Sequence, residues 1–243
     1  MSRSRSVSAV VWIAAAGTIC AAGARAAVVT PIPPLLDLQS VADRVHSFTV
    51  EVRARAFLSN GGAGEGLRVG EAVSVGSGVL VGDGLVATAL SSVALRRSDG
   101  DVEPAAEIEV RIDDVGTLPA RLVAGDLASD VAVLRLPEQA RALSGATLAD
   151  GDPAAGDAVI AIGVDGDALH VVRVNVDRVE PNGSRDRVFT DPALPRPFTG
   201  GPMFDSAGRL AGVSTPSSTD PALAAPASVL RALLLRMHER TGI

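Results

Sequence analysis

Thr199 carries a hydroxyl group in a glycine-rich stretch, where a side chain of this kind can act as a nucleophile. Residues 197–202 read Pro-Phe-Thr-Gly-Gly-Pro, and they are followed by Met-Phe, a turn at 205–208 and the run 209–215. This order predicts a tight loop that leads into a two-stranded hairpin. A hydroxyl in such a loop becomes a nucleophile only when a base removes its proton and donors stabilise the oxyanion.

Two further blocks precede this loop in the chain. Residues 76–89 begin with Gly-Ser-Gly, continue through an apolar run and a glycine turn, and end with a second apolar run that contains Thr88. Residues 120–134 place Asp130 directly before the run Val-Ala-Val-Leu. Apolar runs of this length, bounded by turn residues, predict β-strands. We therefore expect both blocks to lie in β-structure.

The three blocks, in this order, resemble the trypsin-like serine proteases, and specifically their bacterial HtrA-type branch. In that family the loop reads Gly-Asn-Ser-Gly-Gly-Pro, the catalytic histidine lies three residues after the threonine matched by Thr88, and an aspartate precedes the last apolar run. The resemblance therefore implies that Thr199, Ser91 and Asp130 occupy the nucleophile, base and acid positions of a catalytic triad. Pro197 and Thr199 then occupy the positions that supply the oxyanion donors.

Three of these positions depart from the family pattern. Ser91 cannot act as a base near neutral pH, and Thr199 carries a methyl group that restricts its rotamers. Pro197 has no N–H, so it cannot supply an oxyanion donor. Removing one such donor costs about 10² to 10³ in rate, and removing the base costs more. The resemblance therefore implies a protease fold that is catalytically inactive and acts by binding a peptide or protein.

Two other functions remain open. An active serine-type endopeptidase would need a displaced base, for which His46 and His170 are the candidates, and a purely structural envelope domain would bind no peptide. Family members hold substrate as an added antiparallel strand along the edge that follows the nucleophile hairpin. The resemblance therefore implies peptide binding at Val213, Ser214 and Thr215, and we expect it to be weak.

Composition narrows the range of partners. The chain has 243 residues, 47% of them hydrophobic, and a net charge of −6. Residues 1–26 contribute three arginines and no acid, which leaves −9 for residues 27–243. Such a charge argues against nucleic acid or an anionic membrane as the main partner. The chain contains no phosphate-binding or dinucleotide motif and no clustered metal ligands, so we expect no cofactor and no metal.

The first residues predict export. A basic start, an apolar run and the site Ala24-Arg25-Ala26 are typical of a secretory signal peptide, so we expect a secreted or periplasmic protein. No membrane span is expected after signal cleavage, and the oligomeric state stays open.

We expect an all-β fold of two six-stranded antiparallel β-barrels, of the trypsin-like type, with a short N-terminal helix and a C-terminal helix. The helices are expected at residues 35–46 and 227–240, on the basis of their apolar periodicity. The expected domains are listed in chain order: a signal peptide at 1–26, an extended spacer at 27–37, the first barrel at 38–136, a linker at 137–153, and the second barrel with its helix at 154–243.

Overall fold

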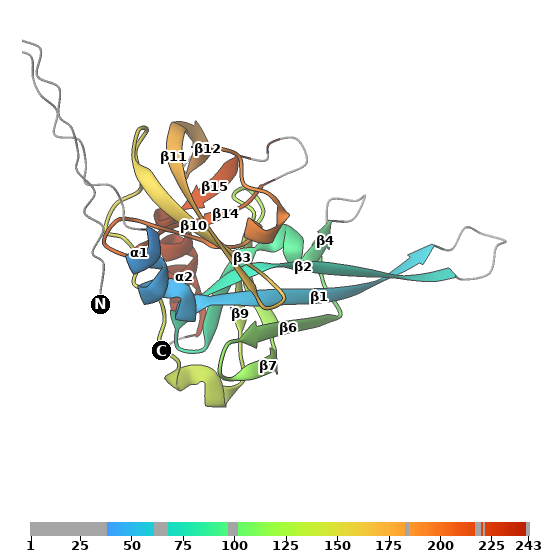
Figure 1. The fold of residues 1–243 in the computed structure, drawn as a ribbon. Helices are drawn as coiled ribbons and strands as arrows, with labels where there is room; N and C mark the ends of the chain where they lie inside the picture. Colours follow the sequence, from blue (N-terminus) through green and yellow to red (C-terminus); the bar gives the residue numbers. More distant parts are fainter. Residues whose placement is uncertain are drawn as a thin grey trace, which may run out of the picture. The chain divides into compact units, whose positions relative to one another are not determined.

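The computed structural model describes residues 38–60, 68–96, 102–182, 185–216, 220 and 222–241. The predicted signal peptide and spacer lie outside these residues. The described part is mostly β-structure with two α-helices, α1 (Leu38–Val45) and α2 (Ala227–Thr241) (Figure 1). None of the described helices combines the length and the apolar character that a membrane span requires.

The first half of the described chain forms an antiparallel sheet of seven strands in the order β7-β6-β1-β2-β3-β9-β8. Its strands are β1 (Thr49–Asn60), β2 (Arg68–Gly82), β3 (Leu85–Ala89), β6 (Glu107–Ile112), β7 (Gly116–Pro119), β8 (Arg121–Asp126) and β9 (Val131–Arg135). Two short strands, β4 (Ala94–Arg96) and β5 (Val102–Pro104), pair separately.

The first sheet differs in one respect from the closed six-stranded barrel that we expected. β7 and β8 follow each other with only Ala120 between them, yet β7 pairs with β6 and β8 pairs with β9. The N–H of Ala120 bonds to the carbonyl of Ile108 at 2.8 Å, which marks the bend. The sheet is therefore a half-barrel with β7 and β8 at its edges.

Alternation of apolar and polar residues explains which face of this sheet is buried. Along β6, Ile108, Val110 and Ile112 are buried, while Glu107 and Glu109 are exposed. Successive side chains of a strand point to opposite faces, so one face carries the apolar residues. The buried face packs into a core of its own, built from residues of β1, β2, β3, β6 and β9.

The second half of the described chain forms a closed barrel in the order β10-β11-β12-β15-β14-β13. Its strands are β10 (Ala158–Asp165), β11 (Ala168–Asn182), β12 (Arg185–Asp191), β13 (Pro202–Phe204), β14 (Leu210–Ser214) and β15 (Leu223–Pro226). Its interior contains apolar side chains of β10, β11, β12, β13, β14 and β15. Closure pairs β14 on both sides, which matters for the site described below.

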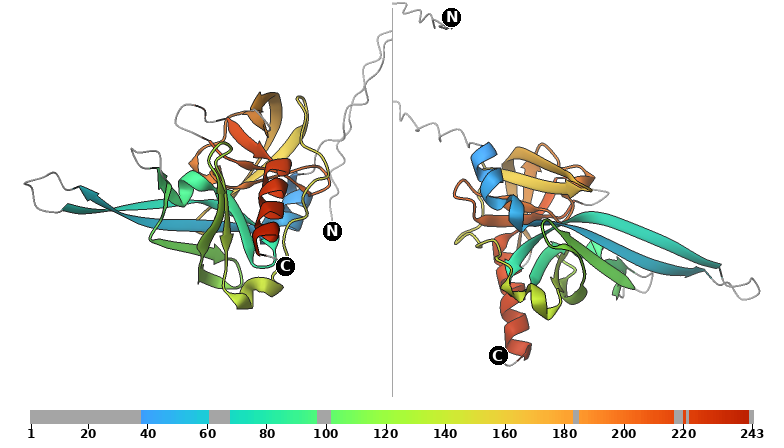
Figure 2. Two further views of the ribbon diagram at one scale, coloured as in Figure 1. Left: turned by 180° about the vertical axis from the view of Figure 1, so that it is seen from behind. Right: turned by 60° about the horizontal axis from the view of Figure 1, so that its bottom comes forward.

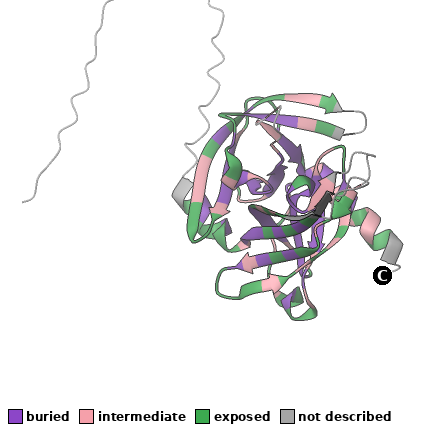
Figure 3. Ribbon diagram, turned by 90° about the vertical axis from the view of Figure 1, so that its right-hand side faces the viewer, coloured by how far each residue is buried: buried purple, intermediate pink, exposed green. Residues whose placement is uncertain are grey.

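A third core joins the two sheets and the two helices. It contains Val41 and Val45 of α1, Leu230 and Leu233 of α2, and buried residues of both sheets. Figure 3 shows the buried residues gathered in the interior and the exposed residues on the outer strands. Because side chains of both halves share this core, the halves are fixed against each other through it.

Two details complete the fold. α1 ends at Val45 and is followed by the 3-10 turn η1 (His46–Phe48), so the predicted helix ends one residue earlier than expected. The hairpin of β1 and β2 is paired over twelve residues of β1 and extends well beyond the neighbouring strands (Figure 2).

Candidate functional site

Ser77 of β2 holds the loop that contains Thr199. Its hydroxyl donates to the carbonyl of Pro197 at 2.7 Å and accepts from the N–H of Val164 at 2.8 Å. Its N–H donates to the carbonyl of Thr199 at 2.7 Å, and its carbonyl accepts from the Thr88 hydroxyl at 2.7 Å. Ser77 itself is fully buried, while its partners Pro197 and Val164 are half-buried. The side chain of a first-sheet residue thus fixes a loop of the second barrel.

The loop itself is a 3-10 turn, η4 (Arg196–Phe198), whose amide groups are turned inward. The N–H of Phe198 donates to the carbonyl of Pro195 at 3.0 Å, and the N–H of Thr199 donates to that of Arg196 at 2.9 Å. Pro197 has no N–H. Of the two amide positions predicted to form the oxyanion site, one therefore lacks a donor and the other uses its donor inside the turn.

Gly200 follows Thr199 at a position where only a residue without a side chain fits. Its φ is +78°, and a Cβ added there would lie 2.3 Å from the Ser77 carbonyl oxygen and 2.3 Å from the Thr88 hydroxyl. The N–H of Gly200 donates to the Ser214 carbonyl at 2.7 Å, and the N–H of Ser214 donates to the Gly201 carbonyl at 2.9 Å. The glycines of this loop therefore permit close packing of backbone against β2, β3 and β14.

Asp130 and Ser91, which were predicted at the acid and base positions, are in direct contact. One carboxylate oxygen of Asp130 accepts from the Ser91 N–H at 2.7 Å, and the other accepts from the Ser91 hydroxyl at 2.7 Å. The Asp130 carbonyl also accepts from the N–H of Leu90 at 2.8 Å. Asp130 has a φ of +55°, a conformation that aspartate adopts more readily than most residues. The carboxylate thus closes a corner between β9 and η2 (Leu90–Ser92).

Burial raises the pKa of the Asp130 carboxyl above its ordinary value, because desolvation disfavours the charged form. The two hydrogen bonds from Ser91 oppose this effect, because they stabilise the carboxylate. Desolvation is the larger cause. Asp130 is therefore held by the hydroxyl and amide of one serine, with no imidazole between it and Thr199 in the described contacts.

Val213, Ser214 and Thr215 are all buried. The N–H and carbonyl of Ser214 are bonded to Gly201 and Gly200, and the N–H of Thr215 donates to the Leu223 carbonyl at 3.0 Å. The hydroxyls of Ser214 and Thr215 are buried without a hydrogen-bond partner among the described residues. Docking a peptide strand on these residues would require exchange of internal hydrogen bonds, so that role stays a prediction.

The two histidines named as displaced bases lie in different places. His46 follows α1, and its Nδ1 donates to the Asp43 carbonyl at 3.0 Å. His170 of β11 lies beside the loop, with its ring centroid 6.3 Å from that of Phe198 and the two rings inclined by 61°. The described contacts of His170 include no hydrogen bond to Thr199. The structure brings His170, but not His46, next to a residue of the loop.

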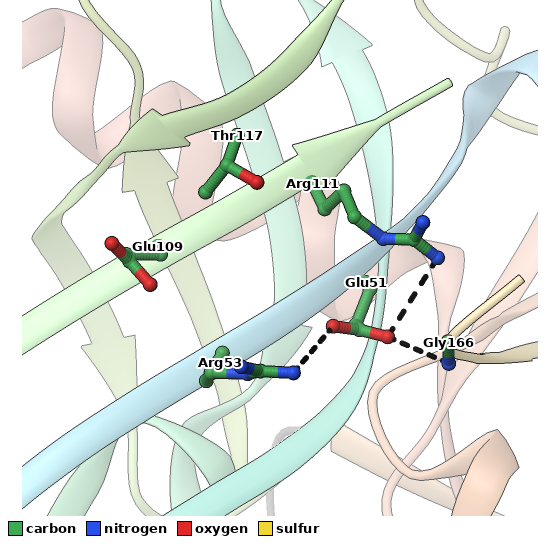
Figure 4. A pocket seen from close by; sticks show the side chains of 6 residues that line it. All are labelled: Glu51, Arg53, Glu109, Arg111, Thr117 and Gly166. Carbon is green, nitrogen blue, oxygen red and sulfur yellow. Dashed lines mark hydrogen bonds and ion pairs between the residues drawn. The ribbon is translucent and has the colours of Figure 1, made fainter.

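A second polar cluster, which was not predicted, joins the two halves of the protein. Glu51 is buried, and its carboxylate accepts from the N–H of Gly166 at 2.8 Å. It also pairs with Arg53 at 3.4 Å and with Arg111 at 3.9 Å, while Arg111 pairs with Asp167 at 2.6 Å. A pocket of about 240 Å³ is lined by Glu51, Arg53, Glu109, Arg111, Thr117 and Gly166 (Figure 4).

Ser77 and Glu51 are the residues that sequence reasoning missed. Ser77 lies in the Gly-Ser-Gly motif, and that motif was the available signal. Glu51 lies on the face of β1 opposite the apolar Val50 and Val52, so local alternation predicts an exposed residue there. It is buried and its carboxylate contacts Gly166 of the second half, which no local pattern signals. Among the described residues, no cluster of His, Cys, Asp and Glu is arranged to hold a metal ion. The adjacent acids Asp113 and Asp114 form the β6–β7 turn.

Comparison with known families agrees with this architecture. Residues 76–213 match the model of the trypsin-like peptidase domain. This match spans more than half of the chain, so the protein belongs to the trypsin-like peptidase family, and its structural neighbours include HtrA-type proteases. No curated protein matches the chain in sequence.

Solved structures show the same fold. A variant of the HtrA-type protease AlgW with a decapeptide has a TM-score of 0.66 and 22% identity, over 85% of this chain and 68% of that one. AlgW with a decapeptide has a TM-score of 0.62 and 21% identity, over 83% of this chain and 67% of that one. An inactive form of the Rv3671c protease has a TM-score of 0.59 and 17% identity, over 81% of this chain and 92% of that one. At these identities, the likeness establishes the fold alone.

Proposed function

We propose that this protein is an exported, catalytically inactive member of the trypsin-like peptidase family that acts by binding a peptide or protein. The observation that carries the proposal is the closed pair of Asp130 and Ser91. An active triad places an imidazole between the acid and the nucleophile, and the base must accept the nucleophile's proton. Here both oxygens of the carboxylate are engaged by Ser91, whose hydroxyl cannot take up a proton near neutral pH.

The loop around Thr199 supports the same proposal. Oxyanion stabilisation requires N–H groups aimed at the position of the developing charge. Pro197 carries no N–H, and the N–H of Thr199 donates to the Arg196 carbonyl. A substrate carbonyl at this loop would find neither of these two donors, so acyl transfer would lack its main electrostatic contribution.

Binding is the part of the proposal that does not depend on the triad. Extended peptides dock on protein edges through backbone groups, which remain when catalytic side chains are replaced. Docking at Val213, Ser214 and Thr215 would compete with internal bonds to Gly200, Gly201 and Leu223. We therefore expect dissociation constants in the micromolar range or weaker, or about −8 kcal/mol at most. The decapeptide of the AlgW structures suggests the type of ligand to try first.

Reaction with a fluorophosphonate probe and turnover of casein test the inactivity. The unmodified protein should show neither labelling nor cleavage, and Thr199→Ser alone should stay inactive because the base and one donor are still missing. Only Ser91→His combined with Pro197→Gly and Thr199→Ser should give measurable turnover. Cleavage by the unmodified protein that is lost in Thr199→Ala would contradict the proposal.

An active endopeptidase with a displaced base is the alternative, and the position of His170 beside Phe198 favours it. A shift of the loop would then bring His170 within hydrogen-bond reach of Thr199, as a general base requires. If this alternative holds, His170→Ala should abolish labelling by the probe, whereas His46→Ala should leave it unchanged. Absence of labelling in the unmodified protein would exclude it.

Binding is tested by titration of an extended apolar peptide into isotope-labelled protein. Amide signals of Val213, Ser214 and Thr215, and those near Thr199, should shift if the peptide docks along β14. Shifts that are confined to the helices, or absent, would favour a purely structural domain. For export, the mass of the mature protein should place its N-terminus within a few residues of Ala27; a chain that starts at Met1 would contradict this part of the proposal.

A further inference from the structure

Arg121 of β8 and Arg135 of β9 lie directly opposite each other. Like charges in this arrangement destabilise a sheet, because the two side chains share one face at close range. Within the described part of the chain, the Arg121 side chain has no hydrogen bond or ion pair. The Arg135 guanidinium donates to the backbone carbonyl of Asp83 at 3.3 Å, which does not neutralise its charge.

The same sheet neutralises its charges elsewhere. Across the β1–β6 pair, Glu51 lies opposite Arg111, and Arg53 lies opposite Glu109. Opposite charges in register stabilise a sheet by the same physical effect that makes like charges unfavourable. The contrast indicates that the arginine pair of β8 and β9 is kept although its electrostatic repulsion destabilises the sheet. Such a local loss of stability is typical of a binding site whose ligand supplies the opposite charge.

Both arginines line a groove of about 450 Å³, within the usual size range of ligand sites. Pro119, Val123 and Pro137 line the same groove and supply apolar surface. The side chain of Val123 is 43% exposed, although it is apolar. Glu138 also lines the groove, but its carboxylate pairs with Arg141 at 3.0 Å. The groove thus combines two uncompensated positive charges with apolar walls.

We propose that this groove binds an acidic segment of a partner protein, with a side-chain carboxylate between Arg121 and Arg135. Guanidinium groups bind carboxylates through two parallel hydrogen bonds, so two arginines in register can hold one carboxylate from both sides. Apolar neighbours of that carboxylate pack against Pro119, Val123 and Pro137. Nucleic acid fits poorly, because the net charge of −9 on residues 27–243 repels a polyanion.

The groove is separate from the candidate site. Asp130 immediately precedes β9, whereas Arg135 is its last residue. Five residues of a strand span about 16 Å. Binding in the groove therefore does not depend on whether Thr199 and its surroundings are inactive, and the two proposals can fail independently.

The test uses the mature protein and an acetylated, amidated hexapeptide in which one Glu is flanked by Val and Leu, so its only carboxylate is a side chain. Isothermal titration calorimetry should show binding that weakens with salt, and replacement of Glu by Gln in the peptide should weaken binding about tenfold or more. Arg121→Gln and Arg135→Gln should each weaken it to a similar extent. Arg173→Gln, at an exposed arginine of β11, is the matched control and should have no effect.

Arg121→Glu separates ligand binding from a structural role. It places a carboxylate opposite Arg135, so we expect a higher melting temperature together with loss of peptide binding. A lower melting temperature in Arg121→Gln without peptide would show that the arginine pair is structural, and unchanged peptide affinity in that variant would also overturn the proposal. Equal binding of the Gln peptide would show that the groove does not recognise a carboxylate and would also overturn the proposal. Binding of inorganic phosphate with the same dependence on both arginines would show a free-anion site in its place.

Discussion

Two serines, Ser77 and Ser91, lie in regions that differ in how they are built. In the first region, Ser77 is fully buried and bonds to Pro197, Thr199, Val164 and Thr88. In the second region, Ser91 is exposed and donates from its amide and its hydroxyl to a single partner, the Asp130 carboxylate. The first region holds the loop by interactions between distant elements, whereas the second satisfies one carboxylate locally.

The difference teaches that support of the loop and chemistry at the loop are separable. The contacts of Ser77 with the loop are to the backbone carbonyls of Pro197 and Thr199, which every residue type supplies, so they do not depend on the side chains at these two positions. The positions that the resemblance aligns with the triad would require particular side chains for catalysis, whereas the fold does not depend on them. Four substitutions test this division, beginning with the one that should have the largest effect.

Gly200→Ala should destabilise the protein most. The added Cβ would lie 2.3 Å from the Ser77 carbonyl oxygen, and the backbone φ of +78° is strained for alanine. We expect a loss of about 4 kcal/mol in the free energy of unfolding, measured by urea denaturation. Gly156→Ala is the control, because its φ is +92° with no atom within 4 Å, and it should cost about 1 kcal/mol. Equal effects of the two would contradict the supporting role of this contact.

Ser77→Ala should cost about 3 kcal/mol, because it leaves the Val164 N–H and the Pro197 carbonyl without their partner in a buried place. Ser91→Ala removes a hydroxyl of the same kind from an exposed position, and it should cost less than about 1 kcal/mol. Urea denaturation of both variants measures the difference. If Ser91→Ala were the more destabilising of the two, the division between supporting and catalytic positions would be wrong.

Glu51→Ala tests how far the support extends, since Gly166 lies in the turn after the strand that carries Val164. Loss of the carboxylate leaves the Gly166 N–H and the Arg53 guanidinium without this acceptor, while Arg111 keeps its pair with Asp167, and it should cost about 2 kcal/mol. Glu109→Ala, at an exposed position of the same pocket, should change stability by less than about 0.5 kcal/mol. Thermal unfolding of both variants measures the two losses of stability. Similar losses would show that Glu51 does not help to hold the two halves together.

Asp130→Asn should have the smallest effect, and that effect should depend on pH. Burial raises the pKa of Asp130 in the folded protein, so the folded state holds this proton more tightly than the unfolded chain does. The stability contributed by the carboxyl therefore falls as pH rises from its ordinary value through its raised folded value. The stability of the unmodified protein relative to Asp130→Asn should decline across that window in urea titrations. If the stability of the unmodified protein relative to Asp130→Asn rose with pH instead, the pKa of Asp130 would not be raised by folding. Asp113→Asn is the control for the general effect of removing one negative charge.

Much of the fold could be predicted from local sequence pattern. The alternation of Ile108, Val110 and Ile112 marks β6, and apolar periodicity predicted α2 with its first residue correct. The resemblance placed Asp130 and Ser91 at related positions, and the structure brings them into contact. The bend at Ala120 was not predicted, although Pro119 directly precedes it, because the local pattern does not show that β7 pairs with β6 and β8 pairs with β9.

Local sequence pattern is enough to predict many of the strands and both helices, because alternation and helical periodicity act between residues that are near each other in the chain. Which strands pair with each other, by contrast, depends on contacts between distant parts of the chain. Ser77 bonds to a residue 120 positions away, and Glu51 to one 115 positions away. Arg121 and Arg135 become neighbours only when β8 and β9 pair. Such contacts depend on strand register and on packing of the two sheets around a shared core, and local periodicity contains neither.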